Sequence, residues 1–474
     1  MLFTSSVFLL FFLPALLLCY FAVPARFLPA RNVVLLLFSL LFYAFGGLRY
    51  LALLAVCVLV NYLGGLAMSR QPDPARRKRV LAAAVAVNLA LLGWFKYAGF
   101  AARTLSALGV PIPVPDIVLP IGISFFTFQG MSYVIDVYRE DVPVQRDPLK
   151  VALYIALFPQ LVAGPIVRYG TVEERLGRRT HTLRDFSDGL TRFLYGFGKK
   201  MLLANAMGKI ADQAFALVGR PGLTVTLAWL GALAYTFQIY FDFSGYSDMA
   251  IGLGKLFGFR FPENFNYPYV SRSVTEFWRR WHMTLSSWFR DYVYIPLGGN
   301  RCAPARHILN LIAVWGLTGL WHGANWTFVA WGLYYGVLLI AEKYLLAGVL
   351  PRVPPPVRQL VTFLLVLLGW VLFRADAIGD AGLYLRTMFG GGTFAAGQTV
   401  YILREYLPEL LLCVLASFPV KRIPMNWLAE RGRKDRRWFL AGEIAPKAFA
   451  LAVFALSYLK LVFGSFNPFI YFQF

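Results

Sequence analysis

The stretch Glu276–Trp331 decides how this 474-residue chain is interpreted. It begins EFWRRWHMTLSSWFRDYVYIPLGGNR (276–301) and, after an apolar run, continues GLWHGANWTFVAWG (319–332). His282 and His322 lie within it, and the whole chain has only four histidines. An imidazole moved out of water costs free energy unless it is hydrogen-bonded or functional. Because a neutral histidine in a dry setting is a good general base near pH 7, the pair indicates a catalytic site.

The composition is that of a membrane protein. Hydrophobic residues make up 58% of the chain, charged residues 15%, and the mean hydropathy is +0.59. Apolar runs long enough to cross a bilayer recur throughout. We therefore expect an all-α polytopic membrane protein, with roughly 11 or 12 transmembrane helices supplemented by re-entrant and amphipathic helices. We treat residues 1–474 as a single domain with a catalytic core at about 120–340.

The net charge of +22 sets the orientation of the chain and does not indicate nucleic-acid binding. Basic residues gather in loops between apolar runs, as they do on the cytoplasmic side of membrane proteins. Four such loops hold 28 of the 46 basic residues: Arg70–Arg79, Arg168–Lys200, Lys255–Arg306 and Lys421–Arg437. With these loops in the cytoplasm, we expect both termini on the outer side of the membrane, which is the periplasm if the protein lies in a bacterial inner membrane, as the resemblance given below implies.

Apolar runs give the expected spans. They are Val7–Phe21, Asn32–Phe45, Leu51–Met68, Val80–Tyr97, Met201–Val218, Thr226–Phe241, Leu360–Phe373, Leu407–Val420 and Phe449–Phe463. A further span follows Pro120 and carries Asp136, and two more apolar runs flank His322. The run LFPQLVAGPIVR (157–168) is broken by proline and glycine, which predicts a re-entrant segment lining an interior space.

Cysteine usage excludes two kinds of site. Cys19, Cys57 and Cys413 lie in apolar spans and Cys302 lies in a basic loop, with no CxxC or metal-ligand spacing. We therefore expect neither disulfides nor a metal site. The first apolar run lacks a basic residue before Arg26, so we expect an uncleaved span and not a signal peptide.

Residues 272–292 predict an amphipathic helix on the cytoplasmic membrane surface. On a helical wheel, His282 falls at the seam between an apolar and a polar side. The apolar side has Val274, Phe277, Trp278, Trp281, Leu285, Trp288 and Tyr292, and the polar side has Arg272, Glu276, Arg279, Ser286 and Arg290. Simple surface anchoring is the alternative, and it leaves His282 without a role.

Asp242 and Asp248 lie close to the membrane in QIYFDFSGYSDMA (238–250). Intramembrane carboxylates are candidates for function, here for lining a pocket. Alternatively, two aspartates with glycine and serine cap and turn a helix end, and this structural interpretation is the one that we favour.

His322 lies in a glycine-broken, aromatic turn with Asn325 nearby. A structural histidine bonded to a backbone carbonyl is the alternative to a catalytic one, but a second histidine on a neighbouring element favours function. GxSxG, Walker, HExxH and dinucleotide-binding motifs do not occur, so hydrolase and nucleotide-driven chemistries lack support. Proton abstraction or acyl-type chemistry by histidine in a membrane cavity remains.

The segments FDFSGYSDMAIGLGKLFGFRFPENFNYPY (241–269), 276–301 and WHGANWTFVAWG (321–332) closely resemble the membrane-bound O-acyltransferase family, in its bacterial alginate and exopolysaccharide O-acetyltransferase branch. The resemblance covers essentially the whole chain. It implies a ring of helices around a central funnel, with His322 as catalytic histidine and His282 as the second active-site position. At position 325 the family pattern has a small residue such as serine, whereas this chain has Asn325, and we expect this difference to affect the shape of the pocket.

The resemblance also implies the substrates and partners. The acyl donor is a cytoplasmic thioester such as acetyl-CoA, and no cofactor is bound permanently. A periplasmic SGNH-type acetyltransferase partner completes transfer to a polysaccharide, beside the synthesis and secretion machinery and membrane lipids. Since only the acetyl group can cross lipid readily, a basic mouth would hold the phosphates of the coenzyme, through Arg279, Arg280 and Arg290.

The last six residues, Phe469–Phe474, carry one hydroxyl, that of Tyr471. Their F-x-Y-x-x-F pattern resembles a C-terminal motif of the family, so we hypothesise that Tyr471 relays the acetyl group as a phenol ester. Docking to the partner and an aromatic membrane anchor are the alternatives.

Two other classes of function stay open from the sequence. An acyl-donor transporter would show repeated halves, which we do not find, and a non-catalytic scaffold gives no reason for buried histidines. Within the enzyme class, peptidoglycan O-acetylation and teichoic-acid D-alanylation are the alternatives to acetylation of an alginate- or cellulose-like polysaccharide.

Overall fold

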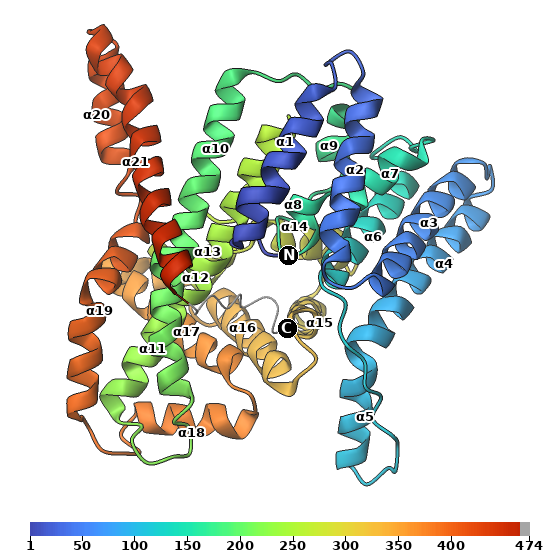
Figure 1. Ribbon diagram of the computed structural model, residues 1–474. Coiled ribbons are helices and arrows are strands. Elements are labelled where there is room, and N and C mark those ends of the chain that lie inside the picture. The colour runs from blue at the N-terminus through green and yellow to red at the C-terminus, as the bar shows by residue number, and fades with distance from the viewer. Residues whose placement is uncertain (465–474) are drawn as a thin grey trace. The chain divides into compact units, whose positions relative to one another are not determined.

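Each expected span overlaps a helix of the computed structural model, which describes residues 1–464 (Figure 1). Over that range the chain forms helices, turns and irregular segments, and no strand. Contacts divide it into two units: an N-terminal unit of Met1–Phe193 with Met249–Pro262, and a C-terminal unit of Leu194–Asp248 with the chain from Glu263 onward. Two long helices, α10 (Leu183–Gly198) and α12 (Val225–Leu256), continue from one unit into the other.

The N-terminal unit contains the first nine α-helices. They are α1 (Leu13–Ala22, preceded by the π-helix Phe8–Phe12), α2 (Leu28–Ala44), α3 (Arg49–Ser69), α4 (Pro74–Leu92), α5 (Ala98–Ala107), α6 (Ile123–Arg139), α7 (Pro148–Ala156), α8 (Phe158–Leu161) and α9 (Tyr169–Gly177).

The C-terminal unit contains α11 and the helices from α13 onward. They are α11 (Asn205–Phe215), α13 (Val274–Trp278), α14 (Met283–Phe289), α15 (Pro304–His322), α16 (Trp326–Tyr344), α17 (Pro355–Arg374), α18 (Ile378–Met388), α19 (Gly397–Ala416), α20 (Arg422–Gly432) and α21 (Arg436–Phe463).

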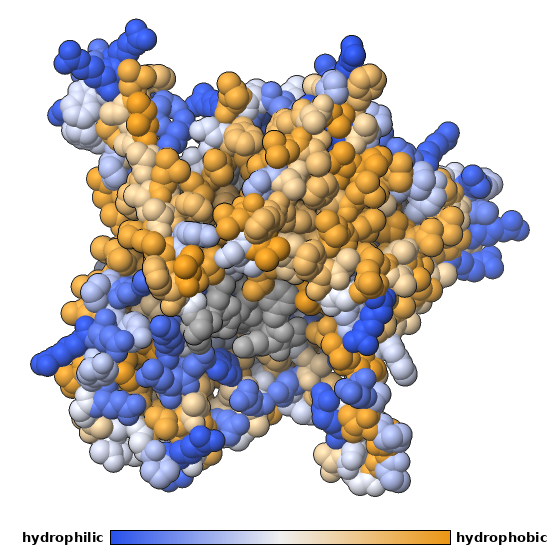
Figure 2. Space-filling model, in the orientation of Figure 1, coloured by the Kyte–Doolittle hydropathy of each residue, from blue (hydrophilic) through white to orange (hydrophobic). Residues whose placement is uncertain are grey.

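Within residues 1–464, four helical stretches are long and apolar enough to cross a membrane, and α1 and α2 are shorter apolar helices. The four are Arg49–Ser69, Pro74–Ala107, Pro355–Arg374 and Arg436–Phe463. Apolar side chains such as Leu59, Leu63 and Leu89 are exposed on α3 and α4, and Figure 2 shows apolar side chains gathered over the helices of the N-terminal unit. Apolar surface of this kind is stable in lipid and not in water, which agrees with a membrane protein.

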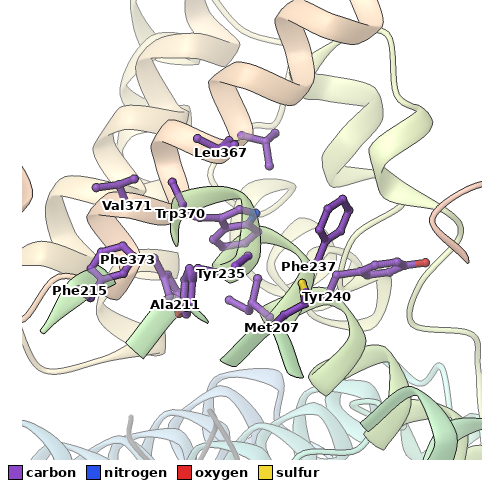
Figure 3. Packing of buried hydrophobic residues seen from close by; sticks show 14 of the residues in the cluster. Met207, Ala211, Phe215, Tyr235, Phe237, Tyr240, Leu367, Trp370, Val371 and Phe373 are labelled. Atoms are coloured by element: carbon purple, nitrogen blue, oxygen red, sulfur yellow. The ribbon is translucent and has the colours of Figure 1, made fainter. Parts of the chain in front are cut away.

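Aromatic side chains form the core of the C-terminal unit. Figure 3 shows α11, α12 and α17 contributing Phe215, Tyr235 and Trp370 to one buried cluster. Phe215 also stacks on Tyr384 of α18, with ring centroids 4.2 Å apart. Aromatic pairs of this kind add to the free energy gained from burying their area, so the cluster gives the unit a rigid interior.

The expected continuous helix over residues 272–292 is wrong, because the chain breaks at His282. This residue takes a left-handed conformation (φ 43°, ψ 51°) between α13 and α14. Backbone groups at the break bond to a neighbouring segment instead of continuing the helix. Asn266 N donates to Arg280 O (2.9 Å), and Met283 N donates to Asn264 O (3.0 Å). These two bonds replace the helical ones that a surface helix would have made.

The favoured interpretation of Asp242 as a helix cap is also wrong. Asp242 lies inside the 32-residue helix α12, and Lys200 satisfies its charge at 2.7 Å, with both side chains almost fully buried. Gly245 allows the backbone near Lys200 to lie close to α12, since a Cβ at Gly245 would lie 2.8 Å from Gly196 O. A buried carboxylate needs such a partner. The ion pair could not be predicted from the sequence, because the two residues are far apart in the chain.

The broken run 157–168 is confirmed as non-helical beyond a four-residue helix, α8. A Cβ at Gly164 would lie 2.6 Å from Pro159 O, so the chain folds tightly back on itself there. Asp136 lies buried on α6 in the same unit. Whether this run lies at membrane depth stays a prediction.

Candidate active site

Helices α15 and α16 form the hairpin that holds His322. The two helices cross at Gly319 and Gly332, and a Cβ on Gly332 would lie 2.3 Å from the Trp315 carbonyl oxygen. Only glycine allows this approach of one backbone to another. His322 is the last residue of α15, and Gly323 follows in an extended conformation. The crossing therefore fixes the end of α15 and the direction of the imidazole.

One hydrogen bond sets the tautomer of His322. Its Nδ1 lies 2.7 Å from the backbone oxygen of Thr318, one turn earlier on α15. A carbonyl oxygen only accepts, so Nδ1 carries the proton and the neutral ring has its lone pair on Nε2. The side chain is 4% exposed and contacts Trp331 and Phe373 through ring centroids at 4.8 and 5.5 Å. The imidazole therefore lies in an aromatic environment.

His282 is held in the same way by a side chain. Its Nδ1 lies 3.0 Å from Oδ1 of Asn264, which also accepts a hydrogen bond from Thr284 Oγ1 (2.9 Å), while Asn264 Nδ2 donates to Ser247 Oγ (3.0 Å). The long contact from the Thr284 backbone N–H (3.4 Å) supports this orientation of the amide, because that group can only donate. Nδ1 of His282 is therefore protonated. Its Nε2 is buried and has no hydrogen-bond partner among residues 1–464.

The structure brings the two histidines together in the C-terminal unit. Trp321 lies between them, with ring centroids 5.9 Å from His282 and 5.0 Å from His322. Burial lowers the pKa of His282 well below its ordinary value, and His322 lowers it further. Each ring binds an oxygen through Nδ1, and His282 favours the neutral form, an arrangement that suits removal of a proton from a hydroxyl.

Comparisons with known proteins identify the family of the chain. Residues 140–371 match the model of the membrane-bound O-acyltransferase family. The chain is 43% identical to the probable alginate O-acetylase AlgI of Azotobacter vinelandii and 43% identical to that of Pseudomonas putida, over 100% of each chain in both cases. The chain belongs to the membrane-bound O-acyltransferase family. A peptidoglycan O-acetyltransferase of Helicobacter pylori is 35% identical, over 82% of this chain and 80% of the relative.

Membership makes the protein an O-acyltransferase, and the matched region overlaps the expected catalytic core at about 120–340. It contains both histidines, Asn264 and the α15–α16 hairpin. Sequence reasoning missed two features of this region: the hydrogen bond between His282 and Asn264, and a carboxylate on α16. Asn264 is one of two amides, with Asn266, in the aromatic run FPENFNYPY (261–269), and polar side chains in so aromatic a run are the signal that could have identified it.

The carboxylate on α16 belongs to Glu342 and caps α13 of the O-acyltransferase. It accepts hydrogen bonds from the backbone N–H groups of Val274 and Thr275 and from Thr275 Oγ1 (2.7 Å). A negative charge at a helix N-terminus also interacts favourably with the helix dipole. Glu342 therefore ties the segment that leads to His282 to the helix that follows His322.

Three predicted pocket residues are engaged in structural contacts. Asp242 pairs with Lys200, and Asp248 pairs with Lys199 at 2.7 Å. Asn325 caps α16 by accepting from Thr327 N and donates to the backbone oxygen of Asp376 (2.8 Å). These contacts account for the three side chains within the fold, and their pocket role stays a prediction.

The three predicted donor-binding arginines differ in their contacts. Arg280 pairs with Glu276 at 2.8 Å and Arg290 with Asp291 at 2.6 Å. Arg279 is exposed, and within the described part of the chain it has no ion-pair partner. Arg279 thus offers its full charge to a ligand. Tyr471 lies outside the described residues.

Proposed function

We propose that this O-acyltransferase takes an acetyl group from a cytoplasmic thioester, acetyl-CoA, and passes it across the bacterial inner membrane for O-acetylation of an exported alginate-like polysaccharide. Its chief support is the pair of buried histidines, each with Nδ1 bonded to an oxygen. The names of the relatives that match over their full length support alginate as acceptor, since the peptidoglycan enzyme is less identical and matches over a shorter part.

His322 is the general base in this proposal. Its Nε2 takes the proton of the attacking hydroxyl, and the hydroxyl oxygen forms a bond to the thioester carbonyl carbon. The carbon–sulfur bond then breaks, and the thiolate takes the proton from the imidazolium, so that a free thiol leaves. The bond from Nδ1 to Thr318 O stabilises the imidazolium and keeps the ring in place throughout.

His282 acts next to that base. Its Nε2 has no partner within residues 1–464, so it can accept a hydrogen bond from the attacking hydroxyl or from a bound water. Because His282 favours the neutral form, it adds no positive charge that would lower the basicity of His322. We assign it to orienting the substrate beside His322.

The donor enters from the cytoplasm at the wide mouth of a funnel formed by a ring of helices. Arg279 supports this entrance because it is exposed and has no ion-pair partner within residues 1–464, and the phosphates of a coenzyme thioester need cationic partners. The positive-inside distribution of the basic loops supports the orientation, with both termini in the periplasm.

Beyond the membrane, a periplasmic SGNH-type acetyltransferase partner completes transfer to the polysaccharide, beside the synthesis and secretion machinery. Tyr471 carries the acetyl group between the two proteins as a phenol ester. A phenolate leaves more easily than an alkoxide, which makes such an ester a competent donor. Mass spectrometry of the C-terminal peptide tests this step, because an acetylated Tyr471 is expected in wild type and none in Tyr471→Phe.

The decisive test is turnover of acetyl-CoA by purified protein in lipid nanodiscs. His322→Ala is expected to reduce turnover by about 10²- to 10⁴-fold, the range for loss of a general base. His307→Gln is the matched control, since His307 is equally buried but both its ring nitrogens bond to tyrosine hydroxyls. It is expected to retain turnover. Near-normal turnover in His322→Ala at a normal membrane level would contradict the assignment.

The acceptor is tested in cells that lack this chain. Acetyl groups on the exported polysaccharide should disappear and return with the wild-type chain but not with His322→Ala. Loss of acetyl groups from peptidoglycan with an unchanged polysaccharide would overturn the choice of acceptor and leave the chemistry standing.

A further inference from the structure

A second cluster of polar side chains lies in the N-terminal unit, apart from the histidine pair. It consists of Tyr20 at the end of α1, Arg31 and Asn32 on α2, and Arg179 and His181 in the loop between α9 and α10. Arg31 and Arg179 are only 5% and 9% exposed. Buried arginines are rare and normally have a carboxylate or several carbonyl oxygens as partners.

Arg179 interacts with Asn32 and with the Tyr20 hydroxyl but has no acidic partner within residues 1–464. Nη2 donates to Asn32 Oδ1 at 2.6 Å, whereas Nε and Nη1 are buried and have no hydrogen-bond partner within residues 1–464. A buried N–H without an acceptor costs free energy, and the cost is larger on a charged group. Nε and Nη1 lie on different edges of the guanidinium, so each edge has an N–H group that can donate to an oxyanion from outside the chain.

Aromatic rings hold the flat faces of both guanidinium groups and leave their edges for hydrogen bonds. Arg179 lies over Phe259 at 4.4 Å, and Arg31 lies over Tyr20 at 5.0 Å. Arg31 directs Nε to the backbone oxygen of Val23 and Nη1 to His181. A cation–π contact uses the ring face and no N–H group, so the stacking orients the arginines without satisfying them.

His181 is a neutral link between the two arginines and Tyr20. Its Nδ1 lies 3.3 Å from Arg31 Nη1, which can only donate, so Nδ1 accepts and Nε2 carries the proton. Nε2 then donates to Tyr20 Oη at 2.9 Å, and that hydroxyl donates to Phe257 O at 3.4 Å. Burial lowers the pKa of His181, and the charges of Arg31 and Arg179 lower it further. The positive charge of the cluster thus stays on the arginines.

Acidic residues do not neutralise this charge. Within residues 1–464, neither Arg31 nor Arg179 forms an ion pair. Asp185 is the carboxylate that influences His181, but it already binds Thr182 Oγ1 (2.8 Å) and Lys255 (3.6 Å). Two buried cations without an anion require one from outside the chain.

We propose that Arg31 and Arg179 bind a phosphate ester, with one of the unpartnered N–H groups of Arg179 donating to a phosphate oxygen. A phospholipid headgroup is the source that the surroundings favour. Phe21, which contacts His181, and Phe27 are exposed apolar residues next to the site, at 39% and 51%, and would lie along acyl chains. Basic pockets between membrane helices recognise anionic lipids in this way. A soluble phosphate monoester, such as a coenzyme nucleotide, is the other source of the same chemistry.

The test is lipid retention and thermal stability of the full chain in detergent. We expect native mass spectrometry to show bound phosphatidylglycerol, and short-chain phosphatidylglycerol to raise the unfolding temperature by roughly 3 to 5 °C at saturation. Arg179→Gln should lose both effects. Arg178→Gln is the matched control, because it removes the same charge from the neighbouring, exposed residue and should keep both.

Further measurements distinguish a phospholipid from a soluble phosphate ester and provide a second variant in case Arg179→Gln does not fold. A shift with adenosine 3′,5′-bisphosphate but not with phosphatidylglycerol, lost in Arg179→Gln, would assign the site to a soluble phosphate ester. If Arg179→Gln does not fold, Arg31→Lys removes the forked donor and keeps the charge, and should weaken retention at least threefold. Equal retention and equal shifts in wild type and these variants, or no effect of either phosphate compound on wild type, would overturn the proposal. None of these readouts depends on acetyl transfer.

Discussion

Asn264→Asp is expected to move the acid limb of the pH–rate profile to higher pH. In wild type, burial and His322 lower the pKa of His282, so His282 remains neutral below its ordinary value near 6.5. The substitution keeps the shape of the side chain and places a carboxylate against Nδ1, where Asn264 Oδ1 now lies at 3.0 Å. A nearby negative charge favours the imidazolium, and therefore raises the pKa of His282.

The size of the shift follows from the geometry. Two charges about 4 Å apart interact by about 4 kcal/mol at an effective dielectric constant of 20. At about 1.4 kcal/mol per pKa unit, this corresponds to an upper limit of about 3 units. Burial raises the pKa of the new carboxyl group as well and removes part of the effect, so we expect a shift of about 1 to 2 units. When the pH is lowered, the Asn264→Asp enzyme should therefore lose activity at a higher pH than the wild-type enzyme does.

The assay is kcat/KM for acetyl-CoA turnover between pH 5 and 8, since this ratio reports groups of the free enzyme. Asn266→Asp is the control, because Asn266 is two residues away and exposed, and its acid limb should stay within about 0.3 units of wild type. An Asn264→Asp enzyme with the wild-type acid limb would show that the protonation of His282 does not govern the reaction, or that Asn264 does not hold it.

Three further predictions test the fold and the donor site. Gly332→Ala should destabilise the protein by about 1 to 3 kcal/mol in thermal unfolding, because the new Cβ would meet the backbone of the facing helix, whereas Gly316→Ala, with open space around it, should have little effect. Arg279→Glu should raise the apparent KM for acetyl-CoA severalfold, and less at high salt; an unchanged KM would place the donor elsewhere. Lys200→Met should cost about 3 to 5 kcal/mol by leaving Asp242 buried without its cation, and adding Asp242→Leu should recover most of the loss; equal instability of the double variant would contradict this account.

The sequence located the helices because apolar runs and their boundaries are local signals. Pro355–Arg374, for example, contains the expected span Leu360–Phe373, and Pro354 and Ala375 flank it in extended conformations. The helix break at His282 had no local signal. It depends on hydrogen bonds to the backbone of residues 264 and 266, and a helical wheel drawn through residues 272–292 cannot contain them.

In the candidate site, too, features with a local sequence signal could be predicted and features that depend on distant contacts could not. His282 and His322 could be selected because a histidine in an apolar setting is costly wherever it lies. Asn264, Lys200 and Glu342 could not, because each acts on a residue 18 to 68 positions away. The helix around Asp242 was misjudged for this reason: the local pattern suited a cap, while the deciding contact came from another helix.

The carboxylate of Glu342 has a consequence for how this enzyme can move. It joins α13 to α16, while the glycine crossing joins α16 to α15, so the supports of both histidines form a single mechanical body. For the thioester donor that we propose, admission would therefore require displacement of other elements around this body. The imidazoles are already aligned when each new substrate binds. In water, solvent dipoles would have to reorient at every turnover. Here the free-energy cost of orienting the polar groups arises once, during folding.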